Sequence, residues 1–391
     1  MRITEELYMG KITKYTDNHG KTKYQFQLYL GKDQTTGKAK MTRRRGFNTK
    51  REAQITRSRL IVELKDKGKI ERSSNMTFKM LYEKWLPIYR STVRESTFST
   101  TQYIFKKRIL PDFEDKFIQK ITPQYCQEIL LTWYRSGFKT YRRWFFYLKK
   151  IFDFAKKQEY IKRNPCAELT LPRNSGSFNK PDNYWNKEEL IRFFNCIDKT
   201  KQPEIYTYFR LLAFTGIRKG ESLALVWSDV DFKNSTLNIN KTLTQGIRGK
   251  KIVQPPKTRA GERIIPIDKK TLATLSKWKE QQAEWYNFLN VDLKSNDKQL
   301  IFANKVNSFL SLYSPGEWLN DIIQENNLKK ITVHGLRHTH ASLLYASGVN
   351  VKEAQKRLGH SDLATTMQIY THISGQQERK AVDQLTNYID F

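Results

Sequence analysis

The segment Thr215-Gly216-Ile217-Arg218-Lys219-Gly220-Glu221 follows an apolar stretch and places a glycine two residues before an arginine. A glycine at this point is typical of a helix end, because it readily adopts the left-handed conformation that closes the last turn. We therefore expect one helix to end near Gly216 and a second to begin near Arg218. Glu221 then lies about one helical turn from Arg218.

Three short motifs and a tyrosine follow this segment in order. Pro256-Lys257-Thr258-Arg259 precedes a predicted strand. His334-Gly335-Leu336-Arg337-His338 opens a predicted helix whose cap is Thr332. Leu358-Gly359-His360 ends another helix, and Tyr370 follows ten residues later.

Five of the six histidines lie in this part of the chain: His334, His338, His340, His360 and His372. A zinc site of the H-E-x-x-H type is not expected, because Gly335 and not glutamate follows His334. The three cysteines, Cys126, Cys166 and Cys196, are too few and too far apart for a disulfide framework or a cysteine zinc site. A Walker loop and an acidic triad for two metal ions are also missing from the sequence. We expect no metal and no cofactor, and we interpret His338, His340 and His372 as packing, capping or surface residues.

The chain is strongly basic. Its 391 residues include 70 Lys and Arg against 39 Asp and Glu, a formal net charge of +31, and 38% are hydrophobic. This composition indicates a folded protein with a polyanionic partner, which is nucleic acid before an anionic membrane. The densest apolar run, Trp144 to Leu148, is far shorter than the roughly 20 residues of a membrane span. The N-terminal residues lack the apolar stretch of a signal peptide, so we expect a cytoplasmic protein.

The charge and two linker-like segments suggest three domains. Residues 1–74 hold 19 Lys and Arg against 8 Asp and Glu, residues 75–174 hold 20 against 9, and residues 175–391 hold 31 against 22. Lys65 to Asn75 and Pro172 to Asn183 are polar and lack apolar periodicity. The predicted domains are 1–68, 76–170 and 184–391, the last with a C-terminal tail, 371–391.

The first domain is predicted to be a three-stranded sheet with one helix. Apolar residues alternate with polar ones from Tyr24 to Leu30, and turn residues lie at His19-Gly20 and Thr36-Gly37. A basic strand follows from Lys40 to Phe47, and Thr49 with Glu52 forms a capping box that opens a helix. The strand carries Arg43, Arg44 and Arg45, which could enter a major groove or simply be solvated.

The second domain is predicted to be all helical. The expected helices are Phe78 to Tyr89, Thr97 to Leu110, one opened by Thr122 and Pro123, and Lys139 to Lys157. The last has a core face of Tyr141, Phe145, Leu148, Phe152 and Ala155. Basic residues on its other faces, including Lys139, Arg142 and Arg143, suit phosphate contacts, although a solvated face explains them almost as well. With a mixed α/β third domain, the fold class is multidomain α+β.

The ordered motifs of the third domain closely resemble the tyrosine recombinase (phage integrase) family. The pattern comprises TG-x-R-x-x-E, PKT, H-x-L-R-H, LGH and a late tyrosine, spread over more than 150 residues. The order of domains also resembles the three-part integrases of temperate phages and conjugative transposons. In that family the first domain binds arm-type DNA sites, and the other two encircle the core crossover site.

The resemblance implies a role for each motif residue. Arg218 and Arg337 would bind the scissile phosphate, and Tyr370 would attack phosphorus to form a 3′-phosphotyrosine. Lys257 would protonate the departing 5′ oxygen, although Lys250 and Lys251 lie in the same hairpin region. His334 would assist proton transfer, His360 would hydrogen-bond the phosphate, and Glu221 would orient the site.

The resemblance further implies a homotetramer in the synaptic complex, in which the tail 371–391 docks on a neighbouring protomer. Double-stranded DNA attachment sites would be the partner, with an excision factor and a DNA-bending protein as possible helpers, in a bacterial host cell. Two alternatives stay open. A type IB topoisomerase-like enzyme shares this chemistry, but two DNA-binding domains ahead of the site favour a recombinase. A non-enzymatic DNA-binding regulator would not need the full catalytic set.

Overall fold

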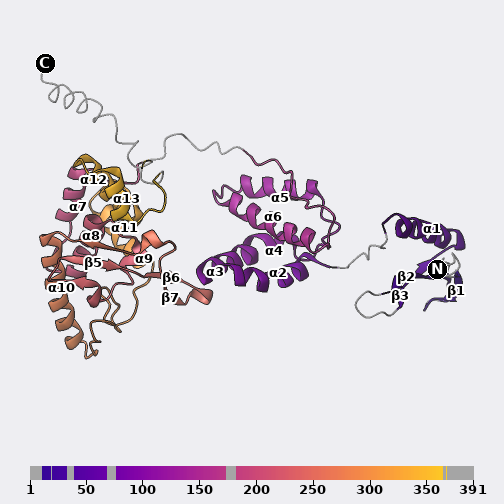
Figure 1. The fold of residues 1–391 in the computed structure, drawn as a ribbon, viewed down its shortest axis with the longest axis horizontal. Helices are drawn as coiled ribbons and strands as arrows, with labels where there is room; N and C mark the ends of the chain where they lie inside the picture. The colour runs from indigo at the N-terminus through magenta and orange to yellow at the C-terminus, as the bar shows by residue number, and fades with distance from the viewer. Residues whose placement is uncertain are drawn as a thin grey trace, which may run out of the picture.

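The computed structural model describes residues 11–18, 20–32, 39–67, 76–172, 182–363 and 367. Three folded regions follow one another along the chain (Figure 1). Tyr370, His372, the tail 371–391, His19 and the predicted turn at Thr36-Gly37 lie outside the described residues. In the part that is described, no helix combines the length and the apolar character that crossing a membrane requires.

The first region is the predicted small sheet with one helix. The strands β1 (Thr13–Thr16), β2 (Thr22–Lys32) and β3 (Ala39–Phe47) pair antiparallel in the order β1-β2-β3, and α1 (Lys50–Lys67) follows. Phe26, Leu28 and Ala53 form the buried core. The Thr49 hydroxyl accepts from the Glu52 N–H as predicted, whereas the Glu52 carboxylate accepts from the Asn48 N–H one residue earlier. Residues 65–67 of the predicted linker belong to α1.

The second region is helical and has a core rich in aromatic rings. Its helices are α2 (Phe78–Thr92), α3 (Glu95–Ile104), α4 (Leu110–Phe113), α5 (Pro123–Arg135) and α6 (Tyr141–Lys157). Thr122 caps α5 by accepting from the Tyr125 N–H, with Pro123 in the first turn as predicted. All five residues of the predicted core face of α6 are buried.

The continuous helix predicted from Thr97 to Leu110 is wrong in detail. The helix begins earlier, at Glu95, and after Ile104 it widens into a π-helical turn, η2 (Phe105–Ile109). The Leu110 N–H donates to the Phe105 carbonyl, five residues back. Pro111 has no N–H to donate to the regular helical ladder, which explains why the regular pattern ends here.

The third region is mixed α/β. Its sheet has the antiparallel order β4-β5-β8, and β6 and β7 form a separate hairpin. The strands are β4 (Val230–Asp231), β5 (Thr236–Ile239), β6 (Thr242–Gln245), β7 (Lys251–Gln254) and β8 (Arg263–Pro266). The helices are α7 (Lys187–Asn195), α8 (Pro203–Thr215), α9 (Lys219–Ser222), α10 (Lys269–Phe288), α11 (Ser314–Glu325), α12 (Val333–Ala346) and α13 (Val351–Leu358). Short 3-10 turns are η3 (Trp227–Asp229), η4 (Ile247–Gly249) and η5 (Arg259–Gly261).

Helix α8 is the centre of this region, because it packs against both α10 and α12. Most of its residues are buried, including Tyr208, Phe209, Leu211 and Leu212. A helix that is apolar on nearly all sides belongs in a core and gives its C-terminus a fixed position. The segment that begins at Thr215 leaves α8 at this fixed end.

Candidate active site

The turn after α8 sets the direction of Arg218. Gly216 adopts the left-handed conformation, with φ of 67°, and closes the helix as predicted. A Cβ atom on Gly216 would lie 2.5 Å from Cδ2 of His340 and 2.8 Å from Cδ2 of Leu358, so a side chain has no room here. Arg218 then occupies the N-cap position of α9. The backbone thereby holds the Arg218 side chain next to the ends of α8 and α13.

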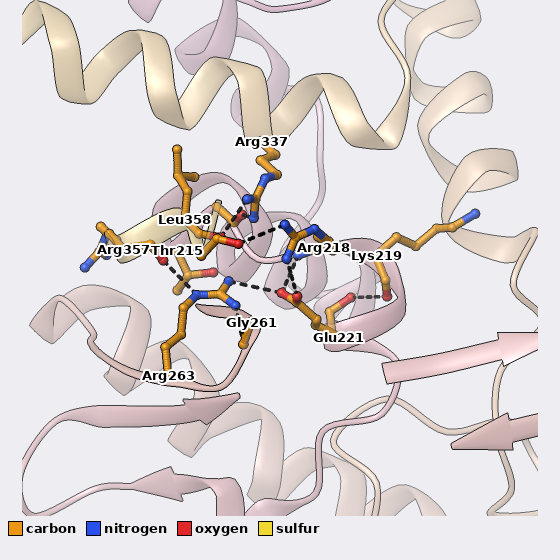
Figure 2. Close-up of polar contacts among 12 residues, drawn as sticks. Thr215, Arg218, Lys219, Glu221, Gly261, Arg263, Arg337, Arg357 and Leu358 are labelled. Carbon is orange, nitrogen blue, oxygen red and sulfur yellow. Dashed lines mark hydrogen bonds and ion pairs between the residues drawn. The ribbon is translucent and has the colours of Figure 1, made fainter. Parts of the chain in front are cut away.

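Glu221 is a buried carboxylate shared by two arginines (Figure 2). Its Oε1 accepts from Arg218 Nη1 at 2.7 Å, and its Oε2 accepts from the Arg218 backbone N–H at 2.9 Å and from Arg263 Nη2 at 3.1 Å. Burial alone would raise the pKa of Glu221, but the nearby Arg263 and Arg218 outweigh it and lower the pKa. Glu221 is therefore ionised at neutral pH and orients both guanidinium groups.

Arg263 extends this network to two further segments. Its Nε donates to the Arg357 carbonyl at 2.8 Å, and its Nη1 donates to the Gly261 carbonyl at 2.9 Å. The side chain is only 6% exposed. Arg263 therefore ties the loop that carries Lys257 to the end of α13 and to Glu221.

Arg337 projects from α12, and two backbone carbonyls anchor its guanidinium group. Its Nη1 donates to the Gly216 carbonyl at 2.7 Å, and its Nη2 donates to the Leu358 carbonyl at 2.6 Å. These acceptors belong to the C-terminal ends of α8 and α13, where the partial negative charge of a helix favours a cation. Burial, followed by the charge of Arg218, lowers the pKa of Arg337 to about 9, so it remains protonated at neutral pH.

The site carries an excess of positive charge. Arg218, Arg263 and Arg337 lie in one another's electrostatic field, and among the described residues Glu221 is the carboxylate that faces them. The Arg218 side chain is 39% exposed and is the most accessible of the three. Such an arrangement suits a bound anion, because planar guanidinium groups donate paired hydrogen bonds to phosphate oxygens.

Three histidines surround the arginines. The rings of His334 and His338 meet edge to face, with centroids 4.9 Å apart. His334 keeps contact with solvent. The protein around it still removes part of its hydration, and together with the charges of His338, Arg337 and Arg218 this lowers the pKa of His334 to about 4. Burial, then Arg337, Arg218 and the other two histidines, lowers the pKa of His360 to about 3. His334 and His360 are therefore neutral at pH 7.

Lys257 is exposed on the loop between β7 and η5. The end of this loop reaches the site, because a Cβ atom on Gly359 would lie 2.6 Å from the Ala260 carbonyl. Of the alternative lysines, Lys251 donates through Nζ to the Phe309 carbonyl at 2.7 Å, while Lys250 is exposed in the β6–β7 turn. Of the three lysines, Lys257 is therefore the closest in sequence to Ala260, where the loop touches the site.

His340, which we expect to pack, lies in the core. Its Nδ1 is 2.8 Å from the Ala213 carbonyl, and its Nε2 accepts from Arg357 Nε at 3.1 Å. Burial, followed by the charge of Arg357, lowers the pKa of His340 to about 3. His340 therefore packs against the C-terminal end of α8 and helps to fix its position.

The proposed DNA-binding residues lie far apart in the chain and differ in their surroundings. Arg43 and Arg45 are exposed, whereas Arg44 is half-buried and on the opposite face of β3. The Arg43 guanidinium donates to Gln25 Oε1 at 2.6 and 3.0 Å. In the helical region Lys139, Arg142 and Arg143 are exposed, and Arg142 donates to the Pro172 carbonyl at 2.8 Å.

Three family models match successive parts of this chain. The model described as "Phage integrase family" matches residues 184–377, "Phage integrase, N-terminal SAM-like domain" matches 77–134, and "Arm DNA-binding domain" matches 12–64. The chain belongs to the phage integrase family of tyrosine recombinases. Enzymes of this family cleave and rejoin DNA.

Relatives and solved structures agree with this assignment. The recombinase is 29% identical over 371 residues to the ICEBs1 integrase of Bacillus subtilis (strain 168), covering 94% of this chain and 97% of that protein. It is 26% identical over 309 residues to the transposase of transposon Tn916 from Enterococcus faecalis, covering 76% and 74%. In fold it resembles the Tn1549 transposon integrase in complex with circular intermediate DNA, with a TM-score of 0.67 at 21% identity over 79% of this chain and 99% of that one.

A lambda integrase tetramer bound to a Holliday junction has a TM-score of 0.56 at 19% identity, covering 94% of the recombinase and 96% of that chain. Together these likenesses confirm the predicted fold class, and the family confirms that the protein is a DNA-cleaving and DNA-rejoining enzyme.

The sequence-based prediction missed Arg263. Its signal lies in the alternation of β8, where Ile265 is buried and Ile264 is 68% exposed. Because neighbouring strand residues point to opposite faces, Arg263 shares the buried face with Ile265. A guanidinium on a buried face needs an acidic partner, and the motif already contained Glu221.

Replacing Arg263 by methionine should weaken both the fold and the activity of the recombinase. The change removes the donor to the Gly261 and Arg357 carbonyls and one of the two donors to Glu221 Oε2, which should lower the free energy of unfolding by about 3 kcal/mol. Arg218 should then shift toward Glu221, and strand cleavage should fall about 10- to 100-fold. Urea unfolding and single-turnover cleavage measure the two effects. Arg259→Met, at an exposed arginine of the same loop, should change neither.

The depressed pKa of His340 should make stability depend on pH. Below about pH 6.5, the ordinary pKa of histidine, His340 of the unfolded chain binds a proton that the folded protein excludes. Proton binding then favours the unfolded chain, so the free energy of unfolding falls as the pH falls. Each such group lowers the free energy of unfolding by up to about 1.4 kcal/mol per pH unit. The difference in stability between the recombinase and its His340→Gln variant should therefore narrow by about 2 kcal/mol between about pH 7 and pH 5. Equal differences in urea unfolding at both pH values would contradict this origin.

Proposed function

We propose that this recombinase integrates a mobile genetic element by cutting double-stranded DNA at core-type attachment sites through the residues around Arg218 and Arg337. The main support is the pair of guanidinium groups held by Glu221 and by two helix ends, with more positive charge than the facing carboxylate neutralises. A phosphodiester in this position receives donors whose orientation is already fixed. Preorganised donors of this kind stabilise the charge that develops at phosphorus in the transition state.

In the proposed cleavage step, Oη of Tyr370 forms a bond to phosphorus, and the bond between phosphorus and the 5′ oxygen breaks. The phenol proton passes to His334, whose imidazole is neutral at pH 7. The negative charge of a bound phosphodiester would offset the arginines that lower the pKa of His334 and so make the ring a stronger base. The Lys257 ammonium donates a proton to the departing 5′ oxygen, and His360 hydrogen-bonds the phosphate. The products are a 3′-phosphotyrosyl ester and a free 5′-hydroxyl. Attack by a partner strand's 5′-hydroxyl on the ester reverses the bond changes and restores Tyr370, without a cofactor.

We assign the three regions to three parts of DNA recognition. Residues 1–68, which include the segment matched by the arm DNA-binding model, bind arm-type sites through the exposed Arg43 and Arg45. Residues 76–170 and 184–391 bind the core site together. Four protomers assemble in the synaptic complex in a bacterial host cell, as the lambda integrase tetramer does on a Holliday junction. The tail 371–391 docks on a neighbouring protomer, and an excision factor and a DNA-bending protein set the direction.

A suicide substrate tests this proposal. A core-site DNA with a nick next to the cleavage position loses a short fragment on cleavage, so the covalent protein–DNA adduct accumulates and is visible on a denaturing gel. Protease digestion and mass spectrometry should then locate the nucleotide on the peptide that contains Tyr370. Attachment to another residue would refute this nucleophile.

The same preparation separates the alternatives. Joining of two site-bearing DNA molecules is expected for an integrase. Relaxation of supercoiled DNA without joining would favour a topoisomerase-like enzyme. Specific binding without any adduct on the natural site would favour a DNA-binding regulator.

A further inference from the structure

Helix α3 of the helical region contacts the β6–β7 hairpin of the catalytic region, and the two meet side by side in Figure 1. Ser99 Oγ donates to the Gly246 carbonyl at 2.9 Å, and the Ile247 N–H donates to Glu95 Oε1 at 3.3 Å. A Cβ atom on Gly246 would lie 2.5 Å from Glu95 Oε1, so a side chain here would displace the Glu95 carboxylate from its contact with the Ile247 N–H. The Ile247 side chain packs against the aromatic core of the helical region.

Arg94, at the N-cap of α3, contacts the loop that follows β7 of this hairpin. Its Nη1 donates to the Pro255 carbonyl at 3.0 Å, and its Nη2 donates to the Pro256 carbonyl at 3.0 Å. These are the two residues immediately before Lys257. We call Arg94, Glu95 and Ser99 the α3 latch.

The loop that carries Lys257 is thus held at two points. The α3 latch fixes the two prolines on its N-terminal side, and proline has little backbone freedom of its own. On the other side, a Cβ atom on Gly261 would lie 2.5 Å from Cβ of Pro256, and Arg263 binds the Gly261 carbonyl. Between these points the Lys257 side chain is exposed.

We propose that the α3 latch positions Lys257 for proton transfer to the departing 5′ oxygen, so that the helical region controls a catalytic group of its neighbour. The inference rests on the proposed role of Lys257. Arg94 is a positioning residue, because its guanidinium contacts the loop backbone and not the reacting atoms. The proton donor is then correctly placed only while the helical and catalytic regions hold this relative position.

A substrate with sulfur in place of the scissile 5′ oxygen separates proton donation from all other steps. A thiolate leaves without protonation, whereas an alkoxide needs a proton from a general acid. On ordinary suicide DNA at saturating enzyme, Arg94→Ala should slow single-turnover cleavage about 10- to 100-fold, less than Lys257→Ala does. On the 5′-thio substrate both variants should cleave within about threefold of the unmodified recombinase, since general acid catalysis no longer contributes.

Three variants serve as controls. Arg90→Ala removes an exposed arginine of the same region whose guanidinium lies over the Phe98 ring, and it should leave cleavage unchanged. Ser99→Ala removes one hydrogen bond of the latch and should show a smaller defect of about threefold with the same rescue. The double variant Arg94→Ala/Lys257→Ala should be no slower than Lys257→Ala alone, because both changes act on one step.

The outcomes distinguish the two levels of the proposal. If the 5′-thio substrate fails to rescue Lys257→Ala, the proposed role of Lys257 is wrong. If it rescues Lys257→Ala but leaves Arg94→Ala and Ser99→Ala slow, the latch acts on some other step and the positioning role is overturned. DNA binding by each variant, measured by gel shift, shows whether the defect arises after the complex forms.

Discussion

Replacing Arg337 by lysine should lower the rate of strand cleavage by about 10³-fold while DNA binding changes little. Arg337 uses two nitrogens to reach the Gly216 and Leu358 carbonyls at 2.7 and 2.6 Å. A lysine ammonium is a single point donor and cannot bind both carbonyls and a phosphate oxygen in one fixed geometry. Lysine retains the positive charge, so the decrease in cleavage rate measures the contribution of the planar guanidinium group. Single-turnover cleavage of suicide DNA at saturating enzyme is the appropriate measurement.

Arg192→Lys is a matched control for this change. Arg192 lies on α7, is exposed and donates to the Asn326 carbonyl at 3.4 Å. Its replacement should leave the cleavage rate unchanged. A rate for Arg337→Lys within tenfold of the unmodified recombinase would show that charge alone suffices at this position.

Replacing Tyr370 by phenylalanine should abolish the covalent adduct, with cleavage reduced by at least about 10⁴-fold. Phenylalanine keeps the ring but lacks the oxygen that forms the ester with phosphorus in the proposed cleavage step. The affinity for the core site should stay within about threefold, because the phosphate donors remain. Gel shift and adduct formation on the same suicide DNA measure both quantities.

Tyr313→Phe provides the comparison for this loss. Tyr313 is 64% exposed on the catalytic region, and its hydroxyl is 3.5 Å from Gln245 Oε1. Its phenylalanine variant should form the adduct at the normal rate. Adduct formation by Tyr370→Phe at a comparable level would assign the nucleophile to another residue.

Local sequence signals predicted the helix ends around the site. Thr332 caps α12 by accepting from the Gly335 N–H, and Gly216 and Gly359 close α8 and α13 in the left-handed conformation, as their positions suggested. Each of these features depends on residues within one turn of the backbone, so a single chain segment contains the information. The spacing of Arg218 and Glu221 likewise predicted their contact.

Contacts between distant segments were not predictable in the same way. Arg263 meets Glu221 across 42 positions, and Arg94 meets Pro256 across 162. Such pairs depend on how the whole chain packs, and an exposed basic residue looks the same in the sequence as a buried one. The π-helical turn before Pro111 was missed for a different reason, because the apolar spacing of the surrounding helix continues through it.

The anchoring of Arg337 by two helix ends has a consequence for how this enzyme can evolve. Gly216 supplies one of the anchoring carbonyls, and Gly359 closes the turn after the other, so the backbone of these glycines and not any side chain determines where the guanidinium points. At Gly359 a Cβ atom would lie 2.6 Å from the Ala260 carbonyl, and at Gly216 it would meet His340. An inherited change at either glycine can therefore silence a mobile element while every acidic, basic and phenolic group of its integrase is still encoded. Inactive copies of such elements should therefore include some in which the only damaging change is alanine in place of one of these two glycines.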